Sequence, residues 1–156
     1  MIEDVVALTH RRLIAIVRGV VPLRAPDLPF VSLEDDDGRV TPIESAAAGH
    51  RHFAWRSLTV PTRPADRVSC VVTWRRLLRV RYDHNGDDEA LELLMAQDAI
   101  RIVDALRIPT DWQMGTTGIL SVVQDGDPGT TTLPGEGTAR IIILGFPFTI
   151  EMEACC

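Results

Sequence analysis

One stretch of the sequence, residues 67–107, limits more than any other what this chain can fold into. It begins with an apolar run, rich in β-branched and aromatic residues, that ends at Tyr82. An acidic turn follows, and then the clearest helical pattern of the chain. Alternating apolar residues predict a half-buried strand, and apolar residues at every third or fourth position predict an amphipathic helix. The stretch therefore predicts a strand, a turn and a helix that covers one face of the sheet containing the strand.

The strand in this stretch alternates between apolar and polar positions with one irregularity. Its apolar positions are Val68, Cys70, Val72 and Trp74, followed after a slip at Leu77–Leu78 by Leu78, Val80 and Tyr82. Such a slip is typical of a β-bulge, or of a tight hairpin around Arg75 and Arg76. With either alternative, Arg79 and Arg81 lie on the polar face of the strand.

The helix in this stretch begins after Asp87 and ends before Pro109. Asp87 follows an Asn-Gly turn and is a favourable N-cap residue, whereas Pro109 cannot continue a helix. The apolar residues at helical spacing are Leu91, Met95, Ala99, Ile102 and Leu106. Asp98 and Arg101 are three positions apart, so we expect an ion pair between them on the polar side. The pattern predicts a helix over 87–107 that packs on the sheet through its apolar stripe.

The rest of the chain predicts a second helix and further strands within one domain. Residues 2–20 combine an apolar stripe with acids first and bases last, as the helix dipole favours. The strand candidates are residues 30–33, 52–60, 118–124 and 139–152. A length of 156 residues suits a single domain. We expect an α+β fold over 1–156, with a mixed or antiparallel sheet packed by the two helices and a flexible tail over 153–156.

Three connecting segments stand out. Residues 34–37 are four consecutive acids, which we interpret as a solvated turn rather than a cation site, because no further ligand follows at a defined spacing. Residues 41–50 predict a loop. Residues 125–138 are rich in Gly and Pro and are longer than a hairpin connection needs, which indicates a functional or disordered loop.

Composition excludes several classes of function. The net charge of −6 argues against general nucleic-acid binding, which needs excess cations to release phosphate counterions. All 16 basic residues are Arg, and without Lys neither a Schiff-base enzyme nor a Walker A phosphate loop is possible. No apolar run reaches the roughly 20 residues of a membrane helix, and no secretory signal is found. We expect no membrane partner.

The motifs that would indicate catalysis, a metal site or a cofactor site are incomplete. Residues 83–88 resemble the start of a calcium loop, but Gly is missing at the sixth position and Glu at the twelfth. Residues 50–52 place two His close together without a third ligand. There is no GxSxG nucleophile elbow, and the Gly-rich residues 126–137 lack the helix of a dinucleotide loop. We expect no catalytic residue, no metal and no cofactor.

Charged residues and cysteines remain as candidates for a functional surface. The arginines of the predicted strand are the densest charge on the chain and suit bidentate pairing with acids of a neighbouring subunit; a plain solvated sheet face is the alternative. The proposed contact residues are Arg75, Arg79, Arg81, Asp83, Asp87, Asp127 and Glu136. Cys70 is interpreted as a core thiol. Cys155 and Cys156 form either a disulfide between copies or a solvated tail without a role.

The order of these elements is similar to that of a known family. An opening helix over 2–20, the segment SLTVPTRPADRVSCVVTWRRLLRVRYD over 57–83, a helix after Asp87 and a closing strand over 139–152 with the alternating run FPFTIEME span most of the chain. In this order they resemble the tail terminator, or tail completion, proteins of tailed bacteriophages.

The resemblance implies a structural protein rather than an enzyme. It implies a homohexameric ring, assembled in the host cytoplasm and located in the virion, that caps the tail tube and joins it to neck and head-closure proteins, with DNA passing only through the lumen. A closed ring requires one patch to meet a different patch on the next copy. The alternatives are another phage neck or head–tail connector protein, or a small ligand-binding or enzymatic α+β domain.

Overall fold

The computed structural model describes residues 2–24, 28–47, 51–63, 71–84, 86–107, 119–135 and 139–153. Its elements are α1 (Ile2–Arg18), β1 (Val31–Ser32), the 3₁₀ turn η1 (Ile43–Ser45), β2 (His52–Ser57), β3 (Val71–His84), α2 (Asp88–Arg107), β4 (Ile119–Gln124), β5 (Gly129–Pro134) and β6 (Arg140–Glu153). The α+β prediction is confirmed, and both helices lie within two residues of their predicted bounds.

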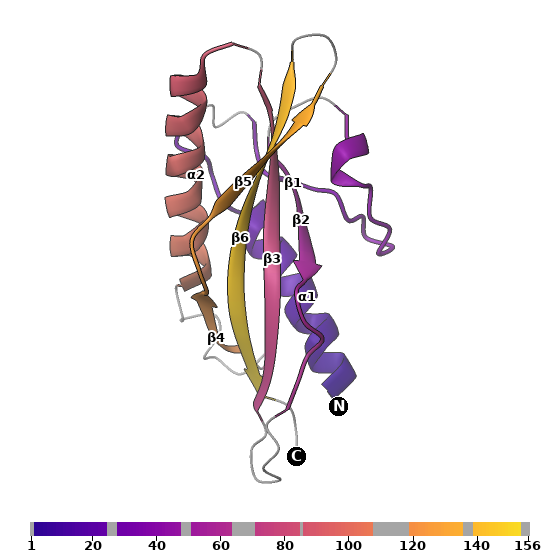
Figure 1. Ribbon diagram of the computed structural model, residues 1–156. Helices are drawn as coiled ribbons and strands as arrows, with labels where there is room; N and C mark the ends of the chain where they lie inside the picture. The colour runs from indigo at the N-terminus through magenta and orange to yellow at the C-terminus, as the bar shows by residue number, and fades with distance from the viewer. Residues whose placement is uncertain are drawn as a thin grey trace.

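The strands form one mixed six-stranded sheet built around two long strands (Figure 1). β3 and β6 pair antiparallel along their whole length, from Val71 opposite Glu153 to His84 opposite Arg140. The order across the sheet is β1-β2-β3-β6-β4, and β5 pairs with β6 on the same side as β4. Among the described strands, β1 alone runs parallel to its neighbour. The expected mixed sheet is therefore present.

The main core lies between one face of the sheet and the two helices. The apolar stripe of α2 contributes Leu91, Ile102 and Leu106, and α1 contributes Leu13 and Val17. The sheet residues that meet them are Phe53, Trp55, Val72, Trp74, Leu78, Val80, Tyr82, Leu144, Phe146, Phe148, Ile150 and Met152. The predicted packing of both helices on the sheet follows from these periodic apolar positions.

The predicted slip in the central strand is wrong. β3 keeps a continuous register with both β2 and β6, so there is neither a bulge nor a hairpin around residues 75–76. The side-chain alternation is also unbroken, because Arg76 occupies a position on the apolar face and is only 3% exposed. The sequence looked irregular because this buried position holds a cation. Tertiary partners for its guanidinium allow an arginine where the pattern requires an apolar residue.

The predicted long loop over 125–138 is also wrong, because its middle is the strand β5. β4 and β5 follow one path along β6, with Gln124 opposite Phe148 and Gly129 opposite Gly145 (Figure 1). Residues 125–128 bulge out between them, and Gly126 has a φ of +117°, which glycine adopts readily. Three consecutive Thr residues favour a strand once β6 supplies the partner backbone. Pairing with β6 therefore outweighs the local turn signals.

A smaller apolar cluster lies on the opposite face of the sheet. Leu33 and Ile43 pack with Ile141 and Ile143, and Leu133 of β5 adds to the contact. The predicted loop over 41–50 thus contains the short turn η1, which is docked on the sheet through the buried Ile43. This cluster explains why β6 is apolar on both faces near its start.

Candidate functional site

The acidic residues 34–37 form the tip of a short turn that faces α1. Glu34 and Val40 form a bridge, and Asp35 Oδ1 accepts hydrogen bonds from the backbone N–H groups of Asp37 (3.0 Å) and Arg39 (2.8 Å). Asp35, Asp36 and Asp37 are exposed, as predicted for a solvated turn. Glu34 is half-buried, which corrects the prediction for this one residue. Asp35 therefore holds the backbone of the turn through its own side chain.

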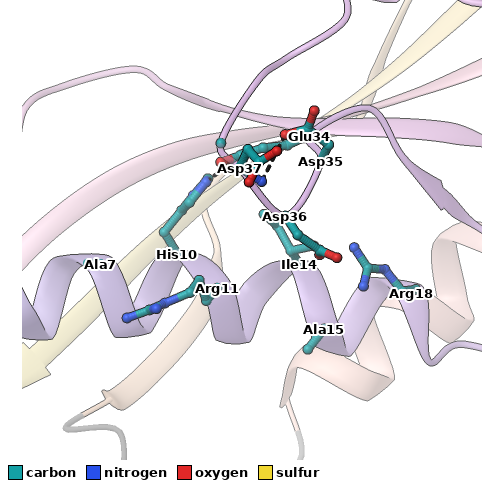
Figure 2. A pocket seen from close by; sticks show the side chains of 11 residues that line it. Ala7, His10, Arg11, Ile14, Ala15, Arg18, Glu34, Asp35, Asp36 and Asp37 are labelled. Carbon is teal, nitrogen blue, oxygen red and sulfur yellow. Dashed lines mark hydrogen bonds and ion pairs between the residues drawn. The ribbon is translucent and has the colours of Figure 1, made fainter.

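A hollow of about 550 Å³ separates this turn from α1. Its lining residues are Ala7, His10, Arg11, Ile14, Ala15, Arg18 and Glu34 to Gly38. Figure 2 shows His10 and Arg18 of α1 pointing toward the turn, and Asp36 of the turn extending over the helix toward Arg18. The hollow thus has cations on its helical wall and carboxylates on its other wall. Within the described residues, no group of three or more His, Cys, Asp and Glu could hold a metal ion.

His10 connects the acidic turn to the buried Arg76. Its Nε2 lies 2.5 Å from Glu34 Oε2, and its Nδ1 lies 2.6 Å from Arg76 Nη1. A guanidinium can only donate, so Nδ1 accepts and the Nε2–H donates to the carboxylate. Both ring nitrogens are therefore occupied, and the ring has no free lone pair with which to act as a general base. The arrangement ties α1, the turn and the sheet together.

Arg76 is buried at the base of this connection. Its guanidinium carbon lies 4.0 Å from the ring centre of Trp74 and 5.8 Å from that of Trp55, close enough for cation–π attraction. Burial lowers the pKa of Arg76 to about 10, and the Glu34 carboxylate acts in the opposite direction. The side chain therefore remains a cation at neutral pH. Sequence reasoning placed Arg76 with the exposed arginines, although its even spacing from Trp74 and Leu78 indicated the apolar face.

A second hollow, of about 480 Å³, lies on the sheet face opposite the helices. Its lining residues are Glu44, Arg56, Leu77, Arg79, Asp127, Gly129, Thr130, Thr131, Leu133, Ile143, Gly145 and Pro147. Two of the predicted contact residues, Arg79 and Asp127, thus lie around one depression although they are 48 positions apart. A third, Arg75, lies on the same face of β3 as Arg79. This open face of the sheet is the surface on which the sequence-predicted residues gather.

Arg75 is already paired within the chain. Its Nε donates to Asp125 Oδ2 at 2.8 Å, and the hydroxyl of Thr149 donates to the same oxygen at 3.0 Å. Both partners of the ion pair are about half exposed. The ion pair links β3 to Asp125, the first residue of the bulge that connects β4 to β5.

The pKa of Asp125 is expected to lie below its ordinary value of 3.8, because the Thr149 hydroxyl and then Arg75 donate to the carboxylate. Because the pKa of Asp125 is lower in the folded than in the unfolded protein, the ionised carboxylate stabilises the fold. This stabilisation is fully present above the pKa of the unfolded state. It is lost as the pH falls through the pKa of the folded state. Replacing Thr149 by Val is expected to move the pKa up toward 3.8 in a carboxyl NMR titration. Thr130→Val, on exposed β5, is the control; an equal shift there would contradict the assignment.

Two other predicted contact residues, Arg81 and Asp83, form an ion pair with each other. Arg81 is only 4% exposed; its guanidinium pairs with Asp83 at 2.8 Å and donates to the backbone oxygens of Ile43 (2.9 Å) and Ala46 (2.8 Å). The interpretation of Arg81 as an exposed contact residue is therefore wrong. The reason is that η1 covers this end of the sheet face and offers unpaired carbonyls to the guanidinium.

Of the remaining predicted residues, Asp87 caps a helix and the others lie outside the described residues. Asp87 is the N-cap of α2, since its Oδ1 accepts from the backbone N–H groups of Glu89 (3.0 Å) and Ala90 (3.2 Å). The predictions that fall outside the described residues are those for Cys70, Pro109, Glu136, Cys155 and Cys156. Those predictions remain predictions.

Sequence reasoning missed a buried polar cluster of Arg51, Tyr82 and Asp98. Asp98 Oδ2 accepts from Arg51 Nε at 2.9 Å and from the Tyr82 hydroxyl at 2.7 Å, and all three side chains are fully or almost fully buried. Arg51 also donates to the backbone oxygens of Leu28 and Arg24 and has a φ of +66°, which a non-glycine residue seldom adopts. Burial, followed by the charge and hydrogen bond of Asp98, raises the pKa of Tyr82.

The expected Asp98–Arg101 pair is therefore wrong. Asp98 is seven positions after Leu91 and four before Ile102, so helical spacing alone places it on the apolar stripe. Arg101 instead donates to the backbone oxygen of Val21. The cluster joins the residue before β2 to β3, to α2 and to the segment after α1, and none of its three side chains lines either hollow.

Comparisons with known proteins add no family to these observations. No model of a known protein family matches the chain, and no curated protein matches it at a significant level. Among the described residues, no helix combines the length and the apolar character needed to cross a membrane. The proposals for function therefore rest on the surfaces described above and on the element order.

Proposed function

We propose that the chain is a structural, ring-forming subunit of a tailed-bacteriophage virion, of the tail terminator kind. The observation that carries the proposal is the sheet face opposite the long helices, where the side chains of Arg79 and Asp127 line one hollow and Arg79 Nε has no hydrogen-bond partner among the described residues. The long helices α1 and α2 pack on the other face. The α+β element order agrees with the resemblance of the sequence to that family.

Such a surface suits contact between copies. A ring closes only through a heterologous interface, in which two different patches of the same chain meet. The hollow offers arginines from β2 and β3 on one side and Asp127 and hydroxyls from the β4–β5 path on the other. A neighbouring copy that entered this hollow would meet groups of both signs, which favours one docking orientation over others.

Native mass spectrometry and negative-stain electron microscopy of the purified chain test the proposal. The expected species is a closed ring of about six times the 17.2 kDa chain mass. Added tail-tube protein from the same genome is expected to form tubes that carry one ring at one end. Higher salt is expected to weaken the ring, because exposed charge pairs are screened. A chain that stays monomeric at low salt with and without tubes, or that forms open filaments, contradicts the proposal.

A second candidate, a small ligand-binding domain, is favoured by the hollow between α1 and the acidic turn. Its helical wall carries Arg11 and Arg18, and its other wall carries Asp36 and Asp37, which suits a small molecule with both an anionic and a cationic group. A thermal-shift screen of amino-acid-like zwitterions tests it. The expected result is a saturable stabilisation that Arg18→Ala abolishes. If no compound gives a saturable shift, the ligand-binding candidate is contradicted and the ring-forming subunit is the one remaining proposal.

A further inference from the structure

The side of α2 that faces away from the sheet carries apolar residues. Leu93 and Ile100 are 43% and 63% exposed, whereas Leu91 and Ile102 on the sheet side are buried. Successive residues of an α-helix are rotated by about 100°, so Leu93 and Ile100 lie almost directly opposite the stripe that packs on the sheet. In Figure 1 this side of α2 forms the outer boundary of the fold, at the left of the view. α2 is therefore apolar on two opposite sides.

The exposed apolar residues of α2 form one row. Four residues at alternating spacings of three and four positions make up the row, which we call the outer stripe: Leu93, Ala96, Ile100 and Val103. Ala96 is exposed and Val103 is half-buried. Scattered apolar residues on a surface need no partner. A row with this spacing is instead the pattern by which one helix packs along another.

The two ends of the outer stripe carry opposite charges. Glu89 continues the row four positions before Leu93, and Arg107 continues it four positions after Val103. Both charged residues are exposed. A second helix with the same row would bring like charges together if it ran parallel. If it ran antiparallel, each Glu89 would meet an Arg107, so the charges favour the antiparallel direction.

The antiparallel arrangement also matches the outer stripe position by position. Its register has three kinds of facing pair, each of which occurs twice: Ala96 with Ile100, Leu93 with Val103, and Glu89 with Arg107. Ala96 is small, which lets the two helix axes approach closely beside the larger Ile100. Apolar residues thus meet apolar residues at the centre, and opposite charges meet at both ends.

We infer that α2 pairs with α2 of a second copy along the outer stripe, antiparallel and about a two-fold axis. The occupant is a second copy because one helix carries both halves of the complementary pattern. The contact is isologous, since the same patch is used on both chains.

This contact does not depend on the proposed ring. It lies on the helical side of the fold, whereas the hollow lined by Arg79 and Asp127 lies on the other face of the sheet. The two contacts therefore use separate surfaces of the chain. A ring whose subunits all paired through α2 would join a second ring.

The outer stripe is short, which predicts weak pairing that depends on concentration. Stable interfaces bury roughly 1,200–2,000 Å² in total, and one side of a single helix supplies less than its share of such an area. The pairing is therefore measured over a rising series of concentrations by sedimentation velocity of the full chain.

Ile100→Lys is the first test, because it places a charge in the middle of the outer stripe. It is expected to weaken pairing about tenfold or more and to halve the mass of the largest species. The Tm of the diluted chain is expected to stay unchanged, since Ile100 faces away from the core and Lys favours a helix at least as well as Ile. Val60→Lys is the control: it adds the same charge at a residue that is 74% exposed and lies outside α2, and it is expected to associate normally.

A pair of charge variants tests the direction of the pairing. Glu89→Arg and Arg107→Glu each bring like charges face to face, and each alone is expected to weaken pairing. An equimolar mixture of the two variants is expected to restore it, because each variant supplies the charge that the other lacks. Native mass spectrometry identifies the restored species as the mixed pair by its mass.

Equal masses of the Ile100→Lys and Val60→Lys variants at every concentration overturn the pairing and leave the proposed ring intact. A mixture of the charge variants that stays unpaired overturns the register. If the largest species holds two chains, with and without tail tubes, and Ile100→Lys reduces it to one, the pairing is supported and the ring is contradicted. A chain that is monomeric under all these conditions overturns both. If Ile100→Lys fails to fold, the mixture of charge variants decides.

Discussion

Asp98→Ala is expected to lower the free energy of unfolding by about 3–5 kcal/mol, the largest effect of any single polar substitution considered. Asp98 is 0% exposed and accepts hydrogen bonds from Arg51 and Tyr82, which are also buried. Removing the carboxylate takes the acceptor of two buried hydrogen bonds and one negative charge away from the buried guanidinium, and losing one member of a buried ion pair costs more than the pair contributes. Urea unfolding monitored by circular dichroism, at a concentration where the chain is monomeric, measures the change.

Two variants separate the buried pair from ordinary helix effects. Asp104→Ala removes a carboxylate from the exposed side of the same helix and is expected to change stability by less than about 0.5 kcal/mol. Asp98→Asn keeps the shape and one acceptor oxygen but loses the charge, and we expect a loss between those of the two alanine variants. Equal losses for Asp98→Ala and Asp104→Ala would contradict the buried cluster.

Arg81→Ala is expected to cost about 3 kcal/mol and to release the turn η1 from the sheet. The guanidinium of Arg81 satisfies the backbone oxygens of Ile43 and Ala46 and pairs with Asp83. Without the guanidinium, the backbone oxygens of Ile43 and Ala46 lose a hydrogen-bond donor at a buried position. The small apolar cluster around Ile43 then loses the hydrogen bonds that hold η1 against the sheet. Urea unfolding gives the stability, and faster amide exchange over 43–47 gives the local effect.

Arg75→Ala is the control for Arg81. Arg75 also forms an ion pair from β3, but that pair is about half exposed, and we expect a cost of about 0–1 kcal/mol. If Arg81→Ala instead left the monomer as stable as the control and only prevented assembly, then Arg81 would be the intersubunit residue that its sequence pattern indicated.

The sequence predicted the elements that depend on local periodicity. The apolar stripe of α2 and its Asp87 cap are both present, because 3.6-residue spacing and a capping carboxylate act within a few residues. Strands at the positions of β3 and β6 follow from period-two alternation over most of their length, although the sequence pattern wrongly indicated a break in β3. Of the candidate site, the sequence correctly placed Arg79 on the face of the strand opposite Leu78 and Val80.

The predictions were wrong at positions whose neighbours come from distant segments of the chain. Arg76 and Asp98 sit on apolar faces because His10 and Arg51, far away in the chain, supply partners for their charges. Sequence reasoning assumes that a charged side chain faces water, since an unpaired buried charge is costly. The local sequence pattern does not show that a distant segment will supply a partner for the charge.

For this protein, then, the sequence by itself determined the helices, the two long strands and the absence of Lys-dependent chemistry, since these follow from residue type and spacing. Only the tertiary structure decided that β5 is a strand, that Arg81 is buried, and that Arg79 and Asp127 share one hollow. The physical reason is the same in each case. A backbone hydrogen bond, a buried ion pair or a shared surface needs two segments, and only the fold determines which two meet.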